Sequence, residues 1–372
     1  MKLLPLIFAM LAIAASPACA DKLYEGEKRL DVAGYPAVVR YIQGDPSKPL
    51  VIFSPGAHHT ARISYGGHEG AKTEDFLAYW LNKLGYNFLA VSFPIATESG
   101  FMSGPPTPDF TARAWGQQVA EAAKAATLSN KLSGHVVILS WSMGGRVLQP
   151  AFKAVSEAGL TVDGAISLMA TPGIIGLSPE TILKKAPSGY ADRKDAYIRW
   201  ITQLKESNRS NGEREIIPEK IYISEYVGDI PVALEGFGEV YRNGKFEMDS
   251  LSQAKDYGAF DFPNYPLVAV LTDDSPLDAE HVLMDRYWWG LYNAETIFNT
   301  IKRSGIDLSK VSAEKWKSIT DLTAKISGGL VIPVGGNHFF FVGEQGASRA
   351  ANAVDTAIKR LTQFKQELGD LK

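Results

Sequence analysis

Residues 134–148 read GHVVILSWSMGGRVL, and this stretch decides the predicted fold. Residues 136–139 form an unbroken apolar, β-branched run, which predicts a short strand buried on both faces. From Val147 to Val155, apolar residues recur at helical spacing. The strand therefore passes into a helix within a few residues, and Ser142 lies at the apex of the turn between them.

A serine in this context is a candidate nucleophile. The sharp turn lifts the Ser142 hydroxyl clear of the sheet, and small residues at Ser140 and Gly144 let strand and helix pass closely. The backbone N–H of Met143 is expected to face an oxyanion, assisted by the positive end of the following helix. The alternative is a tight turn without chemistry. A base, an orienting acid and a second oxyanion donor elsewhere in the chain would favour the nucleophile.

The composition is that of a globular enzyme of one or two domains. Of the 372 residues, 45% are hydrophobic and 21% are charged, and the formal net charge is −3. This charge disfavours nucleic acid and anionic membrane surfaces as partners.

The N-terminus has the pattern of a signal peptide. Lys2 precedes an apolar run over residues 3–15, and cleavage is expected after Ala20. The run is too short to span a bilayer comfortably, so no stable membrane insertion is expected. Residues 1–20 thus predict a secreted or periplasmic protein. Lipid attachment at Cys19 is the less favoured alternative, because the residues before it match a lipoprotein signal poorly.

Strand and helix patterns alternate through residues 21–172 and 266–372. This alternation predicts an α/β core with a mainly parallel, doubly wound sheet of about eight strands. Residues 173–265 are charged, aromatic and apparently helical, which indicates a cap or lid over the edge where open α/β sheets place their sites. A second helical insertion is expected over residues 281–327.

His338 is the candidate base. It follows the last predicted strand in a glycine-flanked loop, and the glycines allow a turn that returns the ring over the sheet edge. The orienting acid is expected in the turn after a strand that lies between Ser142 and His338. Asp273 and Asp274 follow such a strand. Asp274 is favoured because it lies further into the turn, and Asp273 stays open as the alternative.

The second oxyanion donor is expected in the loop after the strand at residues 50–53. Gly56 permits close backbone approach, and the N–H of Ala57 would join that of Met143. A simple Pro-Gly turn is the alternative. Gly56, His58 and Trp141 are also expected to contact substrate. No carboxylate spacing supports a metal site beside the neighbouring histidines, so neither a metal nor a cofactor is expected.

In chain order, these segments resemble the α/β-hydrolase-fold superfamily, in particular its serine esterases and lipases. The resemblance rests on four segments: residues 55–57, 140–145, 273–276 and 336–339. Two departures are Ser140, where the family's elbow usually has glycine, and Pro55, where a histidine often precedes the oxyanion glycine.

The resemblance implies a serine hydrolase that cleaves a carboxylic ester through an acyl-enzyme, with Ser142, His338 and Asp274 as its triad, without a cofactor and with a small-molecule or oligomeric acyl substrate. Together with the predicted signal peptide, it indicates an exported enzyme. Peptidase, amidase or lactonase chemistry would use the same triad. A non-catalytic binding protein on the same fold is the alternative from a different class.

Overall fold

The computed structural model describes residues 23–102, 104–174 and 183–371. The predicted signal peptide lies outside the described residues. None of the helices in the described part of the chain combines the length and the apolar composition needed to cross a membrane.

The core is one eight-stranded sheet with the strand order β1-β2-β4-β3-β6-β7-β12-β13. The strands β1, β2 and β4 pair antiparallel, and every pair from β4 onward to β13 is parallel. Their bounds are β1 (Glu27–Val32), β2 (Tyr35–Ile42), β3 (Leu50–Ser54), β4 (Asn87–Ser92), β6 (His135–Trp141), β7 (Thr161–Leu168), β12 (Val268–Thr272) and β13 (Val331–Pro333). The predicted mainly parallel sheet of about eight strands is confirmed.

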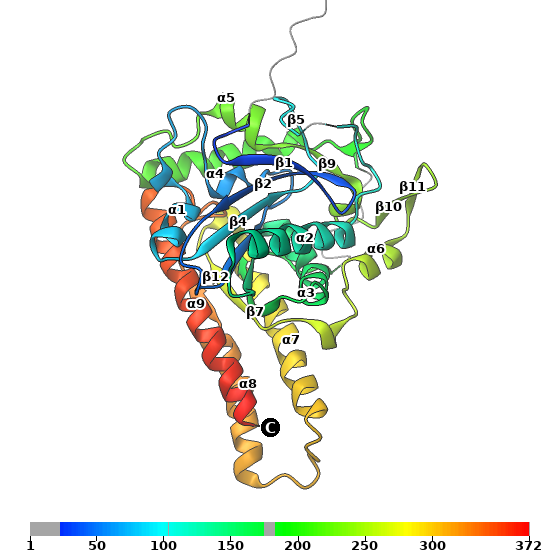
Figure 1. Ribbon diagram of the computed structural model, residues 1–372, viewed down its shortest axis with the longest axis vertical. Coiled ribbons are helices and arrows are strands. Elements are labelled where there is room, and N and C mark those ends of the chain that lie inside the picture. Colours follow the sequence, from blue (N-terminus) through cyan, green and yellow to red (C-terminus); the bar gives the residue numbers. More distant parts are fainter. Residues whose placement is uncertain (1–22, 103, 175–182, 372) are drawn as a thin grey trace, which may run out of the picture.

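Alternating residues of the central strands divide between two hydrophobic cores, one on each face of the sheet. On β3, Val51 packs into one core and Ile52 into the other, and both side chains are fully buried. Helices α1 and α9 cover the first face, and α2 and α3 cover the second (Figure 1). Their bounds are α1 (Leu77–Lys83), α2 (Ala112–Asn130), α3 (Leu148–Glu157) and α9 (Glu344–Asp370). Burial on both faces explains why these strands are continuously apolar.

Residues 183–265, expected to be helical, contain short strands as well as helices. Their elements are β8 (Tyr190–Ala191), α4 (Tyr197–Ser210), α5 (Glu219–Ile221), β9 (Gly228–Pro231), β10 (Glu239–Arg242), β11 (Lys245–Met248) and α6 (Ser250–Asp256). Strand β9 pairs with β8 and also with β5 (Ala96–Thr97), which belongs to the loop after β4. This small sheet therefore joins residues 183–265 to the core by backbone hydrogen bonds. Strands of two to four residues are too short for a periodic pattern to predict them.

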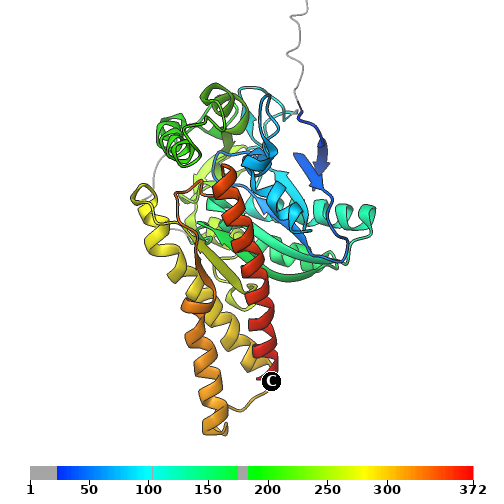
Figure 2. The ribbon, with the colours of Figure 1, turned by 90° about the vertical axis from the view of Figure 1, so that its left-hand side faces the viewer.

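Two long helices follow β12. They are α7 (Ala279–Arg303) and α8 (Ala313–Gly329), which form a hairpin that extends away from the sheet alongside the end of α9 (Figures 1 and 2). Because α7 starts directly after the turn that follows β12, its first residues remain at the sheet edge. The far end of the hairpin is remote from that edge.

Candidate active site

The turn at Ser142 adopts a conformation that is costly for a serine. Strand β6 ends at Trp141, and Ser142 opens the 3-10 helix η3 (Ser142–Val147) with a φ of 53°. This left-handed region favours glycine and costs other residues about 1–2 kcal/mol. The helix α3 continues directly from η3. The strand, the turn with its serine and the helix therefore occur as residues 134–148 predict.

The two glycines after Met143 allow the turn to approach its neighbours. A Cβ on Gly144 would lie 2.5 Å from the carbonyl oxygen of Ser54, and a Cβ on Gly145 would lie 2.3 Å from that of Thr171. Both distances are shorter than any ordinary contact. Gly144 and Gly145 thus allow the turn at Ser142 to pack closely between the end of β3 and the segment that follows β7.

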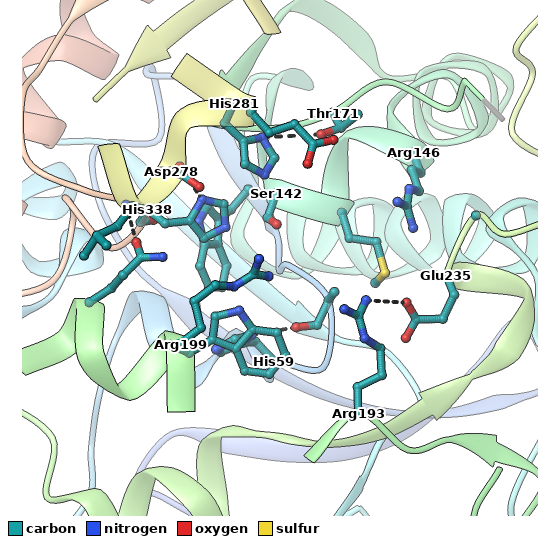
Figure 3. Close-up of a pocket in the computed structure, with 18 of the residues that line it drawn as sticks. His59, Ser142, Arg146, Thr171, Arg193, Arg199, Glu235, Asp278, His281 and His338 are labelled. Carbon is teal, nitrogen blue, oxygen red and sulfur yellow. Dashed lines mark hydrogen bonds and ion pairs between the residues drawn. The ribbon is translucent and has the colours of Figure 1, made fainter. Parts of the chain in front are cut away.

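A cavity of about 500 Å³ lies at this edge of the sheet (Figure 3). Five of the predicted site residues line it: Ala57, Trp141, Ser142, Met143 and His338. They come from the loop after β3, from the end of β6 with its turn, and from the loop after β13. The sheet therefore brings together segments that are far apart in the chain, at the edge where α/β folds place their sites.

His338 pairs with Asp278, a residue that the sequence analysis did not select. The His338 Nδ1 atom is 2.8 Å from Oδ2 of Asp278, and both side chains are buried. Asp274 is instead exposed, and its Oδ1 accepts a hydrogen bond from the backbone N–H of Gly336, 2.9 Å away. The prediction that Asp274 or Asp273 orients His338 is therefore wrong. The chain turns outward at Asp274, and the 3-10 turn η8 (Pro276–Asp278) then brings Asp278 back to the ring.

Asp273 adjoins Asp278 in the interior. Its Oδ1 accepts a hydrogen bond from the N–H of Ser275 at 3.0 Å, and its side chain is within hydrogen-bonding reach of Asp278. Burial, together with the neighbouring Asp278 carboxylate, raises the pKa of Asp273 to about 8. Burial alone would also raise the pKa of Asp278, but the contact with His338 and the hydrogen bond from Asp273 lower it. The raised pKa of Asp273 and the lowered pKa of Asp278 favour the negative charge of the pair beside His338.

Two further contacts fix the His338 backbone. The Trp141 Nε1–H donates to the His338 carbonyl oxygen at 3.0 Å, and the His338 N–H donates to Oε1 of Gln203, on α4, at 3.0 Å. Because Nδ1–H of His338 donates to Asp278, its Nε2 is the basic nitrogen. Within the described residues no hydrogen bond joins this ring to Ser142. Such bonds are commonly longer in ligand-free enzymes than in complexes.

The loop after β3 lies directly against the serine. A Cβ on Gly56 would be 2.9 Å from Cβ of Ser142, so only glycine fits there. The Gly56 carbonyl accepts a hydrogen bond from the N–H of His59, 3.2 Å away. The N–H of Ala57 belongs to the same planar trans peptide and points the opposite way from that carbonyl. Gly56 therefore acts through close approach to Ser142 and does not itself line the cavity, contrary to its expected contact with substrate.

His59, and not His58, lines the cavity. His58 has a φ of 58°, and its buried ring binds the carboxylate of Glu235, so the predicted contact of His58 with substrate is wrong. His59 donates from Nδ1 to the carbonyl oxygen of Ala57 at 2.6 Å and accepts at Nε2 from the Tyr222 hydroxyl at 2.7 Å. Burial lowers the pKa of His59 to about 3, so this ring is neutral at physiological pH.

A second histidine–aspartate pair borders the cavity. His281, in the first turn of α7, has its Nδ1 2.8 Å from Oδ2 of Asp285, and its ring centroid is 4.8 Å from that of His338. Burial alone would lower the pKa of His281, but Asp285 and Asp278 raise it to about 9. His281 is therefore an imidazolium at neutral pH. Its spacing of four residues from Asp285 on a predicted helix was the available sequence signal.

Asp278, His281 and His338 also offer donor atoms that lie within 4.8 Å of one another, a grouping able to hold a metal ion. The Nδ1 atom of each ring is already bound to a carboxylate. Hydrogen bonding within the two histidine–aspartate pairs accounts for the proximity of the three side chains.

No family model and no curated protein matches this sequence. Solved structures do match. An esterase from Rhodococcus sp. ECU1013 has a TM-score of 0.50 at 16% identity, over 90% of this chain and 98% of that one. A haloalkane dehalogenase from Agrobacterium tumefaciens C58 has a TM-score of 0.44 at 12% identity, over 91% and 98%. A thermophilic esterase from Thermogutta terrifontis has a TM-score of 0.42 at 12% identity, over 90% and 99%.

The strand order, the serine at the strained turn and the likeness to the Rhodococcus esterase together define an α/β-hydrolase fold. The resemblance stated from the sequence is thereby confirmed for the fold. At these identities the likeness concerns the fold alone and assigns no subfamily.

Proposed function

We propose that this protein is a serine hydrolase that cleaves a carboxylic ester through an acyl-enzyme intermediate. The observation that carries the proposal is the position of Ser142. It lies on a left-handed turn, in one cavity with a histidine that is bound to a buried carboxylate. A structural serine has no need of this costly backbone conformation, which exposes its hydroxyl at the sheet edge.

In the proposed first half-reaction, the Ser142 hydroxyl attacks the ester carbonyl carbon and transfers its proton to Nε2 of His338. Asp278 holds the ring by Nδ1 and stabilises the imidazolium that forms. Collapse of the tetrahedral intermediate breaks the bond to the alcohol oxygen, and His338 returns the proton to that oxygen. The alcohol leaves, and the acyl group remains on Ser142.

The tetrahedral oxyanion is stabilised by the backbone N–H groups of Ala57 and Met143. Both residues line the cavity, and Met143 lies in the first turn of η3, where N–H groups lack partners within the helix. In the second half-reaction, His338 takes a proton from water, the resulting nucleophile attacks the acyl carbon, and Ser142 leaves with a proton from His338. The cycle consumes one water and needs no other reactant.

The proposal is tested with the purified protein and two serine variants. Hydrolysis of p-nitrophenyl esters from C2 to C12 is followed for the wild type, for Ser142→Ala and for Ser140→Ala. Ser140 is a matched control because its hydroxyl is buried, lacks a hydrogen-bond partner among the described residues and is not part of the cavity lining. We expect Ser142→Ala to lose at least about 10³-fold in kcat/KM and Ser140→Ala to stay near the wild type.

Ester turnover that survives in Ser142→Ala would overturn the proposal. A wild type that is inert on every ester but reacts with a serine-directed fluorophosphonate would instead favour the amidase, peptidase or lactonase form of the same machinery. Absence of both activities would favour a binding protein on the hydrolase fold.

A further inference from the structure

Three arginines line the same cavity as Ser142, and each comes from a different segment of the chain. They are Arg146 on η3, Arg193 in the loop before α4, and Arg199 on α4. Figure 3 shows all three side chains reaching toward the space around Ser142. The chain as a whole has a formal net charge of −3, so this gathering of positive charge does not follow from composition.

Arg146 is held in place by the neighbouring backbone. One Nη1 hydrogen of Arg146 donates to the carbonyl oxygen of Leu234 at 2.7 Å. Gly236 lies against the guanidinium, and a Cβ there would be 2.8 Å from its central carbon. The backbone thus makes room for a guanidinium at the cavity wall. The Leu234 carbonyl and the Tyr257 hydroxyl engage only part of its five N–H donors, so further donors remain for a ligand.

The positive charge of these three arginines is only partly compensated. Glu235 is the lining carboxylate beside these arginines, and it already binds His58 and, at 3.3 Å, Arg193. Burial would raise the pKa of Glu235, but His58 and the two nearby arginines lower it to about 2, so it supplies one negative charge. Arg199 is exposed and has no ion-pair partner among the described residues.

The other acidic groups of the cavity lining, Asp278 and Glu280, lie beside histidines. Asp278 binds His338, and Glu280 lies in the first turn of α7, next to the cationic His281. The three guanidinium groups therefore carry more positive charge than Glu235, the lining carboxylate that pairs with one of them, can offset. A guanidinium offers paired N–H donors that match the two oxygens of a carboxylate or phosphate. A pocket for a purely apolar acyl chain would gain nothing from these groups.

We infer that the substrate cleaved at Ser142 carries an oxyanion, a carboxylate or a phosphate, which binds between Arg146, Arg193 and Arg199. This inference rests on the proposed function and adds the chemical class of its substrate. It predicts selection for esters that have a free anionic group at a distance from the scissile bond.

The test compares ethyl esters that differ in their terminal group. Ethyl hexanoate and monoethyl adipate have the same ester and chain length, but the adipate ends in a carboxylate where the hexanoate ends in a methyl group. A third substrate, ethyl 6-(phosphonooxy)hexanoate, carries a phosphate on the same chain. The anionic ester with the higher kcat/KM relative to ethyl hexanoate identifies whether the arginines select a carboxylate or a phosphate.

Arg199 is the residue to change, because it is exposed and its loss leaves no buried carboxylate unpaired. Arg199→Ala and Arg199→Glu are compared with Arg209→Ala and Arg209→Glu, which change an exposed arginine of the same helix outside the cavity. We expect the wild type to prefer an anionic ester in kcat/KM. Arg199→Ala should reduce that preference about 10- to 100-fold, Arg199→Glu should reduce it further, and the Arg209 variants should keep it.

The experiment distinguishes a wrong substrate class from a wrong proposed function. Hydrolysis of all three esters without an anionic preference, unchanged by Arg199→Glu, would overturn the inference and leave the hydrolase in place. If no ester is cleaved, calorimetry measures whether monoethyl adipate and the phosphate ester bind to Ser142→Ala, and so tests the anion site without catalysis. Binding that Arg199→Glu abolishes would retain the anion site, and no binding of either ester would overturn it.

Discussion

Asp278 binds His338 through a 2.8 Å contact between Oδ2 and Nδ1, from a position at the N-terminus of α7. The acid therefore lies at the end of the turn that follows β12, beyond Asp274, where η8 passes into α7. Asp278 is the residue immediately before α7, a helix of 25 residues that packs against the sheet. Its position relative to the ring is accordingly set by a rigid element.

The first prediction separates Asp278 from Asp274. Asp278→Asn should lower kcat by about 10²- to 10⁴-fold, because an amide neither fixes the required tautomer of His338 nor stabilises its positive charge. Asp274→Asn is the control, since Asp274 is exposed and caps the loop at Gly336. Steady-state kinetics on the best ester measures both. Equal losses in the two variants, or no loss in Asp278→Asn, would contradict the assignment.

The second prediction concerns pH and Asp273. Its pKa of about 8 in the folded protein exceeds its ordinary value of 3.8, so between these pH values the folded state holds a proton that the unfolded state has released. The contribution of Asp273 to the free energy of unfolding should therefore fall as pH rises through this window, by up to about 1.4 kcal/mol per pH unit, and level off above it.

Asp273→Asn supplies the comparison, because an amide can donate to Asp278 and cannot ionise. Urea unfolding at pH 5, 6 and 7 should show the stability of the variant improving relative to the wild type at each step. Parallel pH profiles for the two proteins would mean that Asp273 does not hold a proton in the folded state.

The third prediction concerns close approach at the elbow. Gly144→Ala places a Cβ 2.5 Å from a backbone oxygen, so it should destabilise the fold by about 1–3 kcal/mol and lower kcat. Gly290→Ala is the matched control, because Gly290 lies within α7 with open space around it. That variant should gain about 0.5–1 kcal/mol from its better helix propensity. Thermal unfolding measures both, and a neutral Gly144→Ala would contradict the packing described.

The fourth prediction concerns the link between α4 and the histidine loop. Gln203→Leu removes the acceptor for the buried N–H of His338 and should cost about 1–3 kcal/mol in unfolding free energy, with a lower kcat. Gln363→Leu, at an exposed position of α9, should change neither. Retention of full kcat in Gln203→Leu would show that α4 does not position His338.

The local parts of the site could be predicted from the sequence. The strand and helix around Ser142 follow from runs of adjacent residues, and the two glycines after Met143 are required by contacts that any such turn makes. The place of His338 follows from chain order and from the glycines that precede it. The mainly parallel sheet of eight strands follows from the alternation of strand and helix patterns along the chain.

The parts that depend on distant contacts could not be predicted. Which of His58 and His59 faces the cavity is decided by Glu235, which is 177 residues away from His58 in the chain. Which acid reaches His338 depends on how η8 folds the chain back after Asp274. From the sequence, Asp278 is interpretable only as a helix N-cap. An aspartate at that position is usually explained by its stabilisation of the helix, so nothing in the pattern indicates a contact with His338.

The most direct measurement is active-site labelling with a fluorophosphonate, followed by peptide mass spectrometry. Wild-type protein should take up one equivalent, with the adduct on Ser142. Ser142→Ala should take up none, and Asp278→Asn should react much more slowly. An adduct on another residue, or a folded wild type that is never labelled while Ser142→Ala behaves identically, would contradict an activated serine at this site.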